Sequence, residues 1–241
     1  MKKSQLIVAL DVETLAEVKT LIKKLGKAVD IYKVGSQLFT ACGPAVVRFI
    51  LARGKKVFLD LKYHDIPTTV ANAVRAAVGL SIPVDQGREK QNNGIYMLTV
   101  HTLGGKSMLQ AALLTAEQQA HEMGLERPFV VGITVLTSEE KQDDIHELVL
   151  QRARLAKEAG LDGVVASAQE AGAIRKDLGE DFIIVTPGIR APGAKQNDQK
   201  RVATPGEAVG NGSDFLVIGR PILQSEDPLG SAKNILQEIN K

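Results

Sequence analysis

The sequence predicts a single-domain α/β protein in which eight parallel strands close into a barrel, the (β/α)8 or TIM barrel. Short aliphatic or β-branched runs alternate along the whole chain with longer segments whose apolar residues recur at helical spacing. Eight such runs occur in 241 residues, which is a usual length for this barrel as one unit. An open doubly wound sheet shows the same alternation, but the number of units favours the closed barrel.

The eight predicted strands are almost continuously hydrophobic, as expected for parallel strands covered by helices. In chain order they span residues 6–11, 31–35, 56–62, 95–101, 129–137, 163–167, 182–186 and 215–219. After the first strand, apolar residues at positions 15, 18, 21, 22 and 25 follow helical spacing, and a similar pattern precedes Gly160. Each strand is therefore expected to lead into a helix.

Polar side chains stand at or just beyond the carboxyl ends of these predicted strands. They are Asp11, Lys33, Asp60, Lys62, Thr137, Ser167 and Arg220. In a (β/α)8 barrel all eight carboxyl ends open at one mouth, where active sites lie. The pattern therefore predicts an active site at that mouth.

Two long segments interrupt the alternation of strands and helices. Residues 81–94 are polar, rich in Gly and Asn, and precede the fourth strand, so we expect an inserted loop on the face opposite the active site. Residues 191–206 follow the seventh strand and open on the active face. Their length there suggests a lid on the phosphate side of the site.

Composition excludes several classes of protein. The chain is 44% hydrophobic and 24% charged, which is typical of a soluble globular protein. A formal charge of +2 and the absence of Trp disfavour a nucleic-acid groove built on stacking. Cys42 is the only cysteine, so no intrachain disulfide or thiolate metal cluster can form. No stretch approaches the roughly 18 apolar residues of a membrane helix, and we expect a cytoplasmic protein.

The segment 60–69 (DLKYHDIPTT) carries the strongest chemical signal. Strand alternation places Asp60 and Lys62 on one face, while Asp65 lies beyond the strand end. Two carboxylates would thus flank one ammonium group, with Lys33 expected at the neighbouring strand end. A surface ion-pair cluster is the alternative interpretation.

The loops after the seventh and eighth strands predict a phosphate site, because barrels often bind phosphate there. These loops contain Gly188, Arg190, Gln199, Gly219 and Arg220. Gly219 lets the backbone approach an anion closely, and Arg220 offers two parallel donors that match phosphate oxygens. The alternative is that residues 219–221 only turn the chain after the last strand.

Taken together, these motifs resemble the orotidine 5'-phosphate decarboxylase family, whose signature core is Asp-x-Lys-x-x-Asp. Six further segments look like family segments and occur in the family order: ALD at 9–11, YKVG at 32–35, VLTS at 135–138, TPGIR at 186–190, DQKR at 198–201 and IGRPI at 218–222. The resemblance spans nearly the whole chain except residues 81–94. It implies decarboxylation of orotidine 5'-monophosphate to UMP and CO2, the last step of de novo UMP biosynthesis, without a cofactor or metal.

The resemblance also implies roles for the matched residues. Lys62, Asp60, Asp65 and Lys33 would form the catalytic set, with Lys62 supplying a cation and a proton. The substrate ligands would be Asp11 and Lys33 at the ribose, Thr137 at the pyrimidine, Arg190, Gln199, Gly219 and Arg220 at the phosphate, and in addition Asp60, Asp65, Ile66, Thr69 and Pro187. In this family the enzyme is a homodimer, so Asp65 and Thr69 would reach the partner's site.

Two other functions remain open at this point. Barrels similar to 3-keto-L-gulonate 6-phosphate decarboxylase or hexulose-phosphate synthase share Asp-x-Lys-x-x-Asp but bind magnesium, and they have an acidic residue where Lys33 stands. A lysine there repels the divalent cation that an acid would hold. A noncatalytic barrel that binds a phosphate or nucleotide is the second alternative, because a fold does not by itself imply a function.

Overall fold

The chain folds into a closed barrel of eight parallel strands in the order β1 to β8, which confirms the predicted (β/α)8 architecture. The computed structural model describes residues 4–81, 94–136, 144–190 and 202–240. The strands are β1 Gln5–Ala9, β2 Ile31–Gly35, β3 Lys56–Tyr63, β4 Met97–His101, β5 Phe129–Ile133, β6 Gly163–Val165, β7 Ile183–Thr186 and β8 Phe215–Ile218. Pairing of β1 with β8 closes the barrel.

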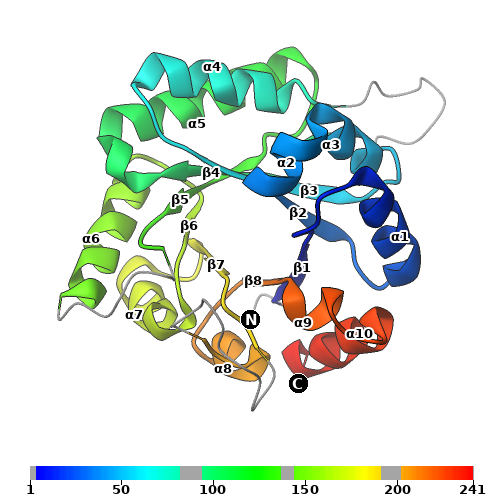
Figure 1. Ribbon diagram of the computed structural model, residues 1–241. Coiled ribbons are helices and arrows are strands. Elements are labelled where there is room, and N and C mark those ends of the chain that lie inside the picture. Colours follow the sequence, from blue (N-terminus) through cyan, green and yellow to red (C-terminus); the bar gives the residue numbers. More distant parts are fainter. Residues whose placement is uncertain (1–3, 82–93, 137–143, 191–201, 241) are drawn as a thin grey trace.

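Helices surround the strands as an outer ring (Figure 1). They are α1 Leu15–Leu25, α2 Ser36–Cys42, α3 Pro44–Leu51, α4 Pro67–Val78, α5 Gly105–Glu122, α6 Ile145–Glu158, α7 Ala168–Leu178, α8 Pro205–Gly210, α9 Arg220–Leu223 and α10 Pro228–Ile239, with a 3-10 turn η1 at Thr102–Gly104. The last helix, α10, packs against α1 and α8 and completes the ring. Among the described residues, none of these helices is long and apolar enough to cross a membrane.

Local sequence signals explain where these helices begin and which face they bury. At the start of α1, Thr14 and Glu17 form a capping box: the Thr14 hydroxyl accepts the Glu17 N–H (3.2 Å), and the Glu17 carboxylate accepts the Thr14 N–H (2.9 Å). Val18, Ile22 and Leu25 then recur on one side of α1 and are buried. The periodicity noted in the sequence is therefore the face that packs on the barrel.

The barrel has two apolar layers, because successive side chains of each strand point to opposite faces. One layer lies between the strands and the helices. The other fills the barrel interior with Ile7, Ala9, Ile31, Phe58, Met97, Val131, Ile183, Val185, Phe215 and Val217. Since the interior is packed, charged residues at the carboxyl ends of the strands project into the mouth rather than into the barrel.

Several strands end earlier than the sequence predicted. The predicted strand 129–137 ends at Ile133, and the predicted strand 163–167 ends at Val165. In the first case the chain leaves the ladder while it is still apolar, because Val135 and Leu136 line a cavity instead of pairing. In the second case Ser167 is not a strand residue but the N-cap of α7, where its hydroxyl accepts the Gln169 N–H.

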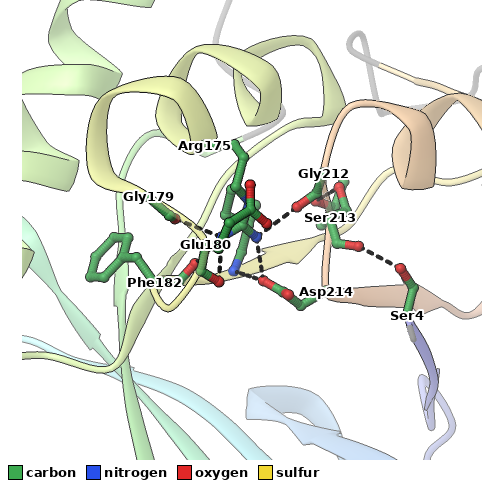
Figure 2. Close-up of polar contacts among 10 residues, drawn as sticks. Ser4, Arg175, Gly179, Glu180, Phe182, Gly212, Ser213 and Asp214 are labelled. Atoms are coloured by element: carbon green, nitrogen blue, oxygen red, sulfur yellow. Dashed lines mark hydrogen bonds and ion pairs between the residues drawn. The ribbon is translucent and has the colours of Figure 1, made fainter. Parts of the chain in front are cut away.

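At the opposite face of the barrel, Arg175 ties together the segments that lead into β7 and β8 (Figure 2). Its guanidinium donates hydrogen bonds to the carbonyl oxygens of Gly179, Glu180, Phe182 and Gly212, at 2.7–3.0 Å, and to Asp214 Oδ2 at 2.7 Å. The same carboxylate oxygen accepts the Ile184 N–H at 2.8 Å. This cluster closes the seam of the barrel away from the mouth.

Candidate active site

Four charged side chains, from β2, β3 and the segment that follows β1, meet at the mouth in alternating sign. Lys33 Nζ lies 3.4 Å from Asp11 Oδ1 and 3.6 Å from Asp60 Oδ2. Lys62 Nζ lies 2.8 Å from the same Asp60 oxygen. Asp60 is only 8% exposed, so its charge is held by these two ammonium groups rather than by water. The structure thus brings together four residues that the sequence placed at neighbouring strand ends.

The backbone at Lys62 is irregular, which simple strand alternation did not predict. Lys62 has φ 51°, and among the described residues it is the only non-glycine residue with a positive φ. The pairing of β3 with β4 shifts in register between Leu59 and Tyr63. The contact between Asp60 and Lys62 therefore arises from a bulged strand end, where local distortion redirects a side chain.

Thr99 is a residue of the site that the sequence analysis missed. It lies in β4, is fully buried, and its hydroxyl accepts the Lys62 N–H (2.8 Å) and donates to Asp60 Oδ1 (3.1 Å). A threonine inside an apolar strand is usually a packing residue, so its residue type gave no signal. The available signal was its place in the strand that neighbours the signature motif.

A cavity of about 210 Å³ lies next to these four charged side chains. Its lining includes the predicted residues Asp11, Lys33, Asp60, Lys62, Pro187, Arg190, Gly219 and Arg220. Its apolar wall, which the sequence analysis did not predict, is formed by Ala9, Phe58, Ile133, Val135, Leu136, Val165, Ala166 and Val217. The cavity lining therefore combines charged residues, two arginines among them, with apolar side chains.

Gly219 stands where β8 ends and leaves room for a neighbouring carboxylate. A Cβ atom at this position would lie 2.9 Å from Asp11 Oδ2, closer than real Cβ contacts allow. Arg220 follows directly and lines the cavity. Arg190 also lines it, although it is 7% exposed and its Nη1 donates to the Ile189 carbonyl at 2.8 Å. The two predicted phosphate-side arginines thus border one cavity.

Asp65, Ile66 and Thr69 lie outside this cavity. All three are exposed, and Ile66 has 66% of its surface accessible. Asp65 and Ile66 follow β3 in the turn that leads into α4, where the Ile66 N–H donates to Asp65 Oδ1 at 2.6 Å, and Thr69 lies in the first turn of α4. The structure therefore does not bring these three predicted site residues to the cavity of their own chain.

Other predictions fall wholly or partly outside the described residues. Thr137 and Gln199 lie outside them, as do residues 82–93 of the predicted insertion. The predicted lid ended at residue 206, but Ala203 is bridged to Ile189, and Thr204 caps α8, which contains residues 205 and 206. Residues 191–201 of the predicted lid lie outside the described residues, and the lid stays a prediction.

The match to known proteins extends over nearly the whole chain. A model of the "Orotidine 5'-phosphate decarboxylase / HUMPS family" matches residues 4–235. The chain belongs to this family. Two proteins named orotidine 5'-phosphate decarboxylase, from Syntrophotalea carbinolica and Moorella thermoacetica, are 46% and 45% identical to it. The alignments cover 98% of this chain in both cases, and 95% and 92% of the relatives.

Solved structures of the orotidine 5'-phosphate decarboxylase / HUMPS family agree with the fold. The crystal structure of orotidine 5'-phosphate decarboxylase from Lactobacillus acidophilus superposes with a TM-score of 0.82 at 35% identity, covering 99% of this chain and 100% of that one. The enzyme from Pyrococcus horikoshii, at 24% identity, shares the fold with a TM-score of 0.76. The family resemblance inferred from the motifs is thereby confirmed.

Proposed function

We propose that this chain is a carboxy-lyase that decarboxylates orotidine 5'-monophosphate to UMP and CO2, the final step of UMP biosynthesis, without a cofactor. The names of its relatives and the family match support this reaction. One structural observation favours it over the magnesium-dependent alternative. Lys33 Nζ stands between Asp11 and Asp60, at 3.4 and 3.6 Å from their oxygens.

This position of Lys33 bears directly on the choice between the two chemistries. A divalent cation would need the oxygens of Asp11 and Asp60 as ligands, since magnesium prefers carboxylates and water. The Lys33 ammonium group already pairs with both carboxylates and would repel a second cation close by. Among the described residues, no group of three or more His, Cys, Asp or Glu side chains is placed to hold a metal ion.

The chemical difficulty of this reaction lies in the carbanion. When the bond from C6 of the pyrimidine to the carboxylate breaks, the electron pair stays on C6 without an ordinary electron sink. An enzyme at the upper end of the known range lowers such a barrier by about 20 kcal/mol. Lys62 supplies a cation where this charge develops and then transfers a proton from Nζ to C6, which completes UMP.

Asp60 and the apolar wall favour loss of the carboxylate group. Asp60 Oδ2 holds Lys62 Nζ at 2.8 Å, which keeps the ammonium in place. A substrate carboxylate beside the same aspartate is repelled, and this repulsion disappears when neutral CO2 forms. The side chains of Ile133, Val135 and Val165 line the cavity and suit an apolar product better than an anion.

The phosphate and ribose supply binding energy remote from the reacting carbon. Arg190, Gln199, Gly219 and Arg220 are assigned to the phosphate, Asp11 and Lys33 to the ribose hydroxyls, and Thr137 to the pyrimidine. Binding energy from a distant group can be used to position the substrate at the reacting carbon. Both Arg190 and Arg220 line the cavity, which supports this assignment.

We further propose that two chains share their sites as a homodimer, with Asp65, Ile66 and Thr69 acting in the partner's site. Their exposure, and their absence from the cavity of their own chain, support this assignment. Mixing Lys62→Ala subunits with Asp65→Asn subunits, followed by re-equilibration, should then rebuild one intact site per mixed dimer. Roughly a quarter of wild-type activity is expected. Mixtures as inactive as the separate variants would contradict the shared site.

The proposed function is tested by mixing purified protein with orotidine 5'-monophosphate in buffer containing EDTA and following ultraviolet absorbance as orotate becomes uracil. Wild type should react rapidly and Lys62→Ala should not. Lys55→Ala is a matched control, because Lys55 also pairs with an aspartate (Asp30, 3.0 Å) but at the opposite end of β3.

Each contrary result would lead to a different conclusion about the function. Activity that requires added magnesium would favour the metal-dependent relatives. A folded protein that binds UMP without turning over orotidine 5'-monophosphate would favour the noncatalytic barrel. Equal loss in Lys62→Ala and Lys55→Ala would contradict the role given to Lys62.

A further inference from the structure

Thr99 is a buried residue with no role in the mechanism above, although it contacts both central residues of the site. Its side chain is 0% exposed, and it does not line the cavity. Its hydroxyl accepts the Lys62 N–H at 2.8 Å and donates to Asp60 Oδ1 at 3.1 Å. A hydroxyl has one proton and two lone pairs, so it can make both bonds at once.

The position of Thr99 explains why these bonds exist. Leu59 pairs with Leu98, and Tyr63 pairs with Val100, so residues 60–62 of β3 stand opposite Thr99 alone. Such a bulge leaves backbone groups without partners in the ladder. The Thr99 side chain takes the place of a ladder carbonyl for the Lys62 N–H, at the residue whose backbone has φ 51°.

The two oxygens of the Asp60 carboxylate have different partners. Oδ2 contacts Lys62 Nζ at 2.8 Å and Lys33 Nζ at 3.6 Å. Oδ1 accepts the Thr99 hydroxyl. Rotation of the carboxylate away from the two ammonium groups would break this second contact, in a position where water cannot replace it. The hydroxyl therefore constrains both the carboxylate of Asp60 and the backbone of Lys62.

We propose that Thr99 is a positioning residue of the decarboxylation site. It holds Asp60 Oδ2 toward Lys62 Nζ and stabilises the left-handed backbone from which the Lys62 side chain departs. It does not touch the substrate and acts only through these two residues. The inference rests on the proposed function, because that function gives Lys62 and Asp60 their roles.

Kinetic comparison of Thr99→Val and Thr99→Ser tests the inference. Valine keeps the branched shape and removes the hydroxyl, so kcat should fall at least about tenfold while KM stays within about threefold. Serine restores the hydroxyl, and its kcat should lie within about threefold of wild type. Thr115→Val, in α5, removes another buried hydroxyl (6% exposed) and should leave kcat unchanged. Should the valine variant not fold, Thr99→Ala replaces it in the comparison.

A crystal structure of the Thr99→Val variant provides a readout independent of turnover. The Asp60 carboxylate should rotate or Lys62 should lose its positive φ, with the contact between Lys62 Nζ and Asp60 Oδ2 lengthening from 2.8 Å. Unchanged geometry would overturn the inference, and so would equal losses of kcat in the valine and serine variants. If wild type did not decarboxylate its substrate, the proposed function would fail, while this structure would still decide whether Thr99 sets the geometry.

Discussion

Replacing Arg175 by methionine should destabilise the barrel severely. Arg175 joins the segments that lead into β7 and β8, at the end of the barrel opposite the candidate active site (Figure 2). The side chains of Arg175 and Asp214 are 11% and 15% exposed, and the guanidinium makes five hydrogen bonds. Methionine keeps the aliphatic stem and removes the charge. Asp214 would then remain as a buried carboxylate whose remaining contact is the Ile184 N–H.

Breaking a buried pair by removing one partner costs about 3–5 kcal/mol, because the other charge stays buried without compensation. For a protein of this length, 1 kcal/mol lowers the Tm by roughly 2–4 °C, so a decrease of roughly 6–20 °C is expected. Thermal unfolding followed by circular dichroism measures it. The cost comes from burial rather than from the ion pair itself.

Arg154→Met is the matched control for this argument. Arg154 also pairs with an aspartate at a similar distance (Asp177, 2.8 Å), but the two side chains are 45% and 34% exposed. Solvent screens such a pair, so the Tm of Arg154→Met should stay close to that of wild type. Equal shifts in the two variants would refute the reasoning, because burial would then make no difference.

Three further predictions concern the mouth, the insertion and alkaline pH. Arg220→Ala should lower kcat/KM on the order of 100-fold, since a charged contact to phosphate is lost; a change below about threefold would contradict the assignment. Deletion of residues 83–92 should leave kcat/KM within about threefold of wild type, because the loop is predicted on the opposite face. Burial raises the pKa of Tyr63 to about 12. The unfolded chain loses that proton near pH 10, so this contribution to stability is complete below pH 10 and is lost as pH rises toward 12. Tyr63→Phe should reduce the loss, by up to about 2 kcal/mol allowing for partial exposure, in denaturant titrations at pH 9 and 11.5.

The sequence predicted the number and order of the strands because buried parallel strands leave a strong pattern. It predicted strand ends less well, since an apolar residue that lines a cavity looks like one that pairs in a sheet. Val135 and Leu136 continue the hydrophobic run of β5 after the ladder has ended at Ile133. That these two side chains line a cavity can be recognised only in the three-dimensional structure.

The cluster of charged side chains at the mouth was predictable for a related reason. Lys33, Asp60 and Lys62 lie at the ends of sequential strands, and sequential strands are neighbours in this barrel. The left-handed backbone of Lys62 was not predictable, because lysine rarely adopts a positive φ and nothing in the motif marks it. The role of Thr99 depends on that same bulge, so it too required the structure.

The two ends of the barrel use paired charges for different purposes. Away from the mouth, Arg175 with Asp214 and Arg127 with Asp162 join segments that are 39 and 35 residues apart, and each carboxylate also accepts a strand N–H. In both of these pairs each charge has a fixed partner, which suits stability. At the mouth, Asp60 faces two ammonium groups, and the Lys62 side chain is still 37% exposed. Charges that are open to the cavity on one side can interact with a substrate carboxylate, as the proposed function requires, while the pairs at the opposite end hold the barrel closed.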